Sequence, residues 1–122
     1  MEKLKSARNL LLKLHKIFVD VERNRYEANR GPVSSGEFLG LLLDDPDFAW
    51  LRKFSALIVE IDEMFAQREG YSDESVERHI TAMSALVTMK DEDEQFRTKY
   101  EFAMQNVLEA GGIQGELKSL LT

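Results

Sequence analysis

Two histidines, His15 and His79, are the residues of this 122-residue sequence best suited to bind a metal ion or a haem iron. The di-iron centres of helical bundles need a glutamate three residues before a histidine, which places both ligands on one helical face. Those positions hold Leu12 and Val76, so this kind of centre is excluded. A haem would need a histidine paired with a second axial ligand. Each histidine instead lies beside an apolar helical stripe, as histidines at the edge of a core do.

Other residue types also lack the spacing that chemistry requires. The chain has no cysteine, which excludes thiol nucleophiles, disulfides and thiolate metal sites. Ser34 and Ser35 do not stand in a G-x-S-x-G pattern, and neither a Walker loop nor G-x-G-x-x-G is present. The acidic run at residues 44–47 does not alternate as in a calcium loop, and aspartate before proline is typical of a helix start. We therefore predict no catalytic residue, no metal ligand, no cofactor and no enzymatic activity.

The charge of the chain is acidic overall but basic at its start. The formal net charge is −6 at pH 7, yet residues 1–30 hold eight Lys or Arg and four acids, so the remainder carries −10. Binding to nucleic acid depends on cationic side chains that neutralise phosphates, so an acidic chain does not favour it. We expect the basic segment to lie beside acidic neighbours in the fold rather than on nucleic acid or a membrane. A nucleic-acid accessory that uses residues 1–30 is the least favoured hypothesis.

The first half of the chain predicts three helices. Apolar residues recur every three or four positions over residues 4–29, a period typical of an amphipathic helix, and Gly31 followed by Pro32 should end it. A short helix is expected over residues 35–43, with Ser34 and Glu37 as a capping box. A longer helix is expected over residues 46–69.

The second half predicts two more helices and a tail. Residues 73–89 and 92–110 keep the helical period, and the acidic run between them indicates a tight turn in which Asp91 and Glu94 form a capping box. A single helix over residues 73–110 is the alternative. Two glycines should then break the chain, so residues 111–122 are expected to form a short helical or frayed tail.

These elements predict an all-α fold, an up-and-down four-helix bundle with one additional short helix, in a single domain over residues 1–122. No window approaches the 18 apolar residues of a membrane span, and the N-terminal residues do not form a signal peptide. We therefore expect a cytoplasmic protein that does not insert into membranes.

The central segment, residues 31–63, resembles a group of small uncharacterised bacterial helical proteins whose pattern is GPV..GE.L..LL.DP.FAWLR. The residues that match this pattern are Gly31, Pro32, Val33, Gly36, Glu37, Asp45, Pro46, Phe48, Ala49, Trp50, Leu51 and Arg52, followed in the next helix by Ser55, Leu57, Ile58, Val59, Ile61, Asp62 and Glu63. The resemblance implies a bacterial helical protein but no activity and no site residue.

Protein–protein association is the function that the sequence favours. Phe48 and Trp50 start the third helix on two different sides, so we expect that both cannot point into one core. One should contact the short helix, and otherwise it should lie in a contact with another protein, where tryptophan is often a central residue. With Phe38 and Leu42 they form the predicted interaction region. A homodimer is the expected assembly, an unknown protein partner is possible, and the alternative is a bundle that binds a small hydrophobic ligand or cofactor.

Overall fold

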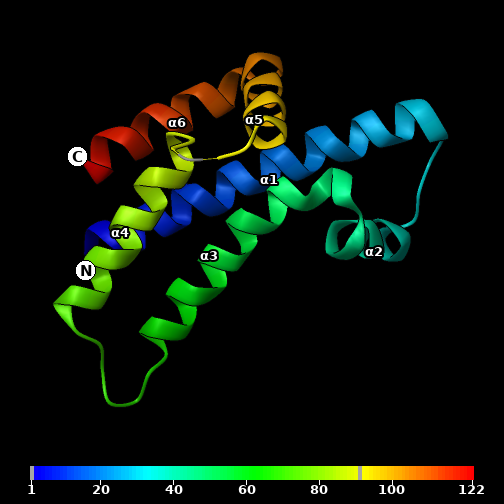
Figure 1. Cartoon of the computed structure of the whole chain (residues 1–122). Coiled ribbons are helices and arrows are strands. Elements are labelled where there is room, and N and C mark those ends of the chain that lie inside the picture. The colour runs from blue at the N-terminus through cyan, green and yellow to red at the C-terminus, as the bar shows by residue number, and fades with distance from the viewer. Residues whose placement is uncertain (1, 91) are drawn as a thin grey trace.

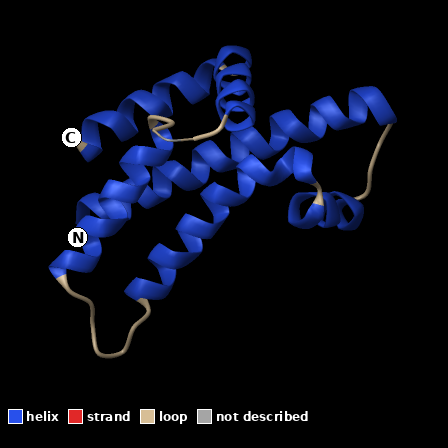
Figure 2. Ribbon diagram, in the orientation of Figure 1, coloured by secondary structure: helices blue, strands red, loops and turns tan. Residues whose placement is uncertain are grey.

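The computed structural model describes residues 2–90 and 92–122, and no strand occurs among them (Figure 2). The all-α prediction is confirmed. The elements, labelled in Figure 1, are α1 (Glu2–Arg30), α2 (Ser35–Asp44), the 3-10 turn η1 (Pro46–Phe48), α3 (Ala49–Phe65), α4 (Asp73–Val87), α5 (Glu94–Asn106) and α6 (Leu108–Leu121). No helix in the described part of the chain is both long and apolar enough to cross a lipid bilayer.

Helix α1 follows its apolar period closely. Its fully buried apolar residues recur every three or four positions: Leu4, Ala7, Leu11, Leu14 and Phe18. The helix ends where Gly31 adopts a positive φ of 86° and its N–H donates to Glu27 O at 2.8 Å. This left-handed glycine closes the last turn, as the sequence predicts.

Side-chain caps start the elements that follow. Ser34 Oγ accepts from Glu37 N at 3.1 Å, which confirms the predicted start of α2. Asp45 then accepts from Asp47 N at 2.8 Å, and Pro46 opens η1 in the first-turn position that tolerates a missing N–H. The expected helix over residues 46–69 is therefore η1 plus α3, and its predicted end is wrong. Helix α3 ends at Phe65, and the exposed residues 66–70 lead to Gly70, which has a positive φ of 83°.

Helices α4 and α5 are separate, so the single helix over residues 73–110 is not formed. Ser72 caps α4, and after Val87 the backbone turns through Met89, which has a positive φ of 58°. The predicted cap at Asp91 lies outside the described residues. The side chain that caps α5 is Asp93, which accepts from Phe96 N at 2.8 Å.

The predicted chain break at Gly111 is wrong, and of the two alternatives for the tail, helical or frayed, the structure has the helical one. The break comes earlier, at Val107, whose backbone is extended (φ −130°, ψ 108°), and α6 runs for 14 residues through three glycines. Burial explains this, because Ala110 and Leu117 are fully buried, and packing overrides a weak helix propensity. Gln114 also anchors the helix, since its Nε2 donates to Val87 O at 2.6 Å.

Helix α1 lies at the centre of the arrangement, with α3 and α6 as its principal neighbours (Figure 1). Helix α6 was not part of the four-helix arrangement expected from the sequence. Aromatic rings from α1, α3 and α5 meet in the core, where the Phe18 and Tyr100 ring centroids lie 5.0 Å apart and Phe54 stacks on Phe96. This shared aromatic cluster fixes how α1, α3 and α5 sit against one another.

Candidate functional site

The structure buries three of the four residues of the predicted interaction region. Phe38, Phe48 and Trp50 are at most 4% exposed, and Leu42 is half-buried. The expectation that Phe48 and Trp50 cannot share a core is wrong, because Phe48 lies in the 3-10 turn and does not follow the angular spacing of α3. Phe48 contacts Phe38 of α2, with ring centroids 5.8 Å apart, whereas Trp50 packs on Phe18 at 5.1 Å.

The exposed apolar side chains of this region belong to α2 itself. Leu39 and Leu43 are 55% and 61% exposed, and with Phe38, Leu41 and Leu42 they form the broad apolar face of α2. An apolar face of that width is normally covered by neighbouring elements. Together with Leu42, these leucines border a hollow of about 200 Å³ whose other walls are His15 of α1 and Leu51, Arg52 and Ser55 of α3.

Two further exposed apolar residues extend this surface. The contacts Arg8–Asp62 at 2.8 Å and Glu22–Trp50 at 3.1 Å show that α1 and α3 run antiparallel. Leu12 precedes His15 by about one turn of α1, and Val59 follows Ser55 by one turn of α3, so both lie next to the hollow. Their side chains are 42% and 52% exposed. We call this surface the α2 face, made of Leu12, His15, Leu39, Leu42, Leu43 and Val59.

A buried carboxylate on α1 is a second chemically distinctive feature. Glu22 is only 1% exposed, and Trp50 Nε1 donates to its Oε2 at 3.1 Å. Arg25 binds the same carboxylate through two nitrogens at 2.9 and 3.1 Å. Lys99 of α5 adds a third contact at 3.2 Å and also donates to the backbone oxygen of Asp47. One carboxylate thus ties α1 to α3, α5 and η1.

The charge on Glu22 is stabilised despite its burial. Burial acts to raise the pKa of this carboxyl, but the hydrogen bonds from Arg25 and Trp50 and the charges of Lys99 and Arg25 hold it below its usual value. Sequence reasoning missed Glu22. The signal was present, since Glu22 lies four residues after Phe18 in the buried row of α1.

The two histidines lie apart. His79 is half-buried, and its Nδ1 donates to Ser75 O at 2.9 Å. His15 faces the hollow of the α2 face, and burial lowers its pKa. Among the residues that the structure describes, no group of three or more His, Asp or Glu side chains is placed to hold a metal ion.

Comparisons with known proteins add no family to these observations. No protein-family model matches the chain. No curated protein and no solved structure matches it either. The α2 face and the network around Glu22 therefore have to be interpreted from their own chemistry.

Proposed function

We propose that this protein acts by association, as a non-enzymatic helical module that pairs with a second copy of itself through the α2 face. The observation that carries the proposal is the exposure of Leu39 and Leu43 on the broad apolar face of α2. Contiguous exposed apolar surface is typical of a protein interface, and a homodimer buries the same patch on both copies.

The size and chemistry of the hollow support association over storage of a hydrophobic ligand. Pockets for ligands of drug size usually span about 300–1,000 Å³. The hollow beside α2 has a volume of about 200 Å³, and Leu39 and Leu43 are among the residues that line it. It has room for one or two apolar side chains from a second copy. With the association we also propose a cytoplasmic location, on the sequence grounds given above.

The test is a native mass spectrum, together with light scattering over a range of protein concentration. The wild type should be a dimer without added mass, and the double variant Leu39→Ser/Leu43→Ser should be a monomer with the same helix content. Leu108→Ser is the matched control, because Leu108 is 95% exposed and lies on α6, outside the α2 face. It should stay dimeric.

Two results contradict the proposal. One is a wild type that stays monomeric at every concentration, and the other is a double variant that dimerises like the wild type. A small molecule that copurifies and is lost from the double variant supports the ligand-binding alternative instead.

A further inference from the structure

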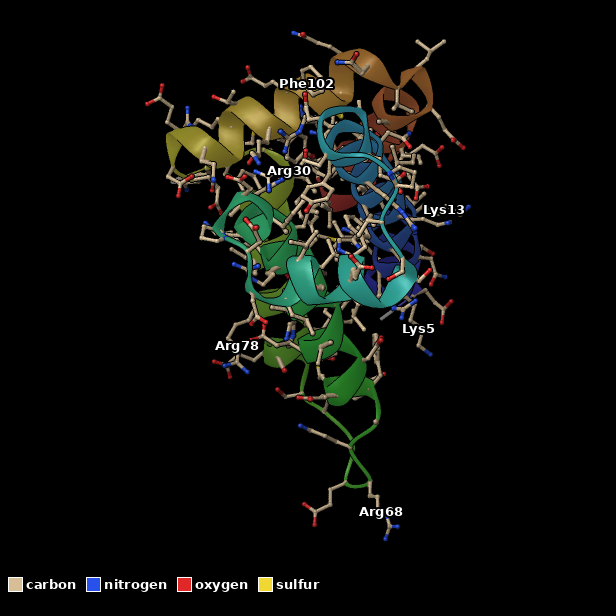
Figure 3. The ribbon with its side chains drawn as sticks, turned by 90° about the vertical axis from the view of Figure 1, so that its right-hand side faces the viewer. Lys5, Lys13, Arg30, Arg68, Arg78 and Phe102 are labelled. Carbon is tan, nitrogen blue, oxygen red and sulfur yellow. The ribbon has the colours of Figure 1, made fainter. Side chains whose placement is uncertain are left out.

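A second hollow, of about 210 Å³, lies where the last turns of α1 meet the junction of α2 and η1. Two basic residues of α1, Arg25 and Arg30, line it together with two acidic residues of the junction, Asp45 and Asp47. Arg30 is labelled in Figure 3, well away from the loop that carries Arg68. This hollow is separate from the α2 face and shares no lining residue with its hollow.

The opposite charges around this hollow attract one another, as those of Arg25 and Asp47 do, without forming an ion pair. In the described chain, no ion pair joins either arginine to Asp45 or Asp47. Arg25 uses its Nε and Nη2 for Glu22, and Arg30 lies over the ring of Tyr26, 5.3 Å from its centroid. The hollow is therefore lined by basic residues of α1 and acidic residues of the junction that no ion pair joins directly.

Both sides of the hollow are held by the buried carboxylate of Glu22. On the α1 side, Glu22 fixes the guanidinium of Arg25 directly. On the other side, Lys99 binds Glu22 and donates to the backbone oxygen of Asp47, so it fixes η1. Buried ion pairs add little net stability, because the cost of removing charges from water offsets their attraction. They do hold neighbouring groups in fixed positions, which is what a binding site needs.

We propose that this hollow binds a small zwitterion, a molecule of amino-acid size with a carboxylate at one end and an ammonium at the other. The carboxylate faces Arg25 and Arg30, where charge-assisted hydrogen bonds are strong, and the ammonium faces Asp45 and Asp47. The rings of Tyr26 and Phe48 also line the hollow. Its volume excludes larger ligands.

The test uses three zwitterions of increasing charge separation, namely glycine, β-alanine and 4-aminobutanoate, with butanoate and butylammonium as singly charged probes. Binding to the full chain is followed by amide chemical shifts in NMR spectra and by calorimetry. The proposal expects saturable binding of at least one zwitterion, with Kd on the order of 1 mM. Butanoate and butylammonium should each bind about tenfold more weakly, because each lacks one of the two charge contacts.

Variants locate the site. Arg30→Gln and Asp47→Asn, both exposed and therefore compatible with folding, should each weaken zwitterion binding about tenfold. Arg68→Gln is the matched control, since this arginine lies in the exposed loop after α3 (Figure 3), and it should bind as the wild type does. Three results overturn the proposal. These are no saturable binding of any zwitterion, butanoate or butylammonium binding as tightly as the zwitterions, or unchanged binding in both site variants.

Discussion

Replacing Glu22 tests the buried network most directly, because three donors from three elements converge on its carboxylate. Arg25 is 38% exposed along its side chain, so its ion pair should contribute only about 0–1 kcal/mol. Trp50 is 1% exposed, so its N–H left without a partner should cost about 1–3 kcal/mol, whereas Lys99, which is 18% exposed, keeps its bond to the backbone oxygen of Asp47 and should cost less. We therefore expect Glu22→Ala to lower the free energy of unfolding by about 3–5 kcal/mol. Glu22→Gln should lower it by about 1–3 kcal/mol, since the amide oxygen still accepts from Trp50.

Urea unfolding followed by tryptophan fluorescence measures this difference, because Trp50 is the only tryptophan and touches Glu22. Glu60→Gln, on the exposed side of α3, is the control and should change the free energy by less than about 0.5 kcal/mol. The pH dependence of the free energy of unfolding gives a second test of the network. The pKa of Glu22 is lower in the folded state than its unfolded value of 4.5. The charged carboxylate therefore stabilises the fold at pH above 4.5, and this stabilisation is lost as the pH falls through the pKa of the folded state. The difference in the free energy of unfolding between the wild type and Glu22→Gln should disappear over that pH range. If Glu22→Gln unfolds at the wild-type urea concentration near neutral pH, the reasoning about this network is wrong.

Two further predictions concern α6 and His15. Gly112→Ala and Gly115→Ala should each raise the free energy of unfolding by about 0.5–1 kcal/mol, because both glycines are exposed within a helix and have open space around an added Cβ. Gly31→Ala, at a φ of 86°, should lower it, and thermal unfolding of the three variants distinguishes these signs. Burial lowers the pKa of His15, so the folded chain binds this proton less readily than the unfolded chain, and stability should fall as pH drops through 6.5. An NMR titration reads the pKa directly, and His15→Gln should remove that part of the pH dependence. A His15 pKa above 6.5 would show that burial does not dominate at this ring.

Helix positions in the first half of the chain depend on neighbouring residues, so they can be predicted from the sequence alone. The apolar row of α1, the left-handed Gly31 and the Ser34 cap each depend on a few neighbouring residues, and each is found where the sequence predicts it. Helix α6 does not follow from local rules. Gly111 and Gly112 predict a break, and only the burial of Leu117 and Ala110 by distant segments reverses that preference.

The candidate sites depended still more on tertiary contacts. Phe48 and Trp50 were interpreted with a uniform helical spacing, which the 3-10 turn at Pro46 interrupts. The exposed leucines Leu39 and Leu43 could be found in the sequence as part of an apolar run, but their exposure depends on how α2 seats on α3. The meeting of Glu22 with Lys99, 77 residues away, has no local signal.

The pairing of α1 with α6 has a consequence for the order in which the chain folds during synthesis. Ser6, Asn9 and Leu10 of α1 share a groove with Gly115, Ser119 and Leu120 of α6, so segments far apart in the chain lie side by side (Figure 1). During synthesis, the surface of α1 that α6 covers in the fold stays exposed to water until α6 has also left the ribosome. A circular permutant that joins α6 to α1 by a short linker turns this distant pair into a local hairpin. Local contacts form faster than distant ones, so that permutant should fold sooner than the natural order of helices.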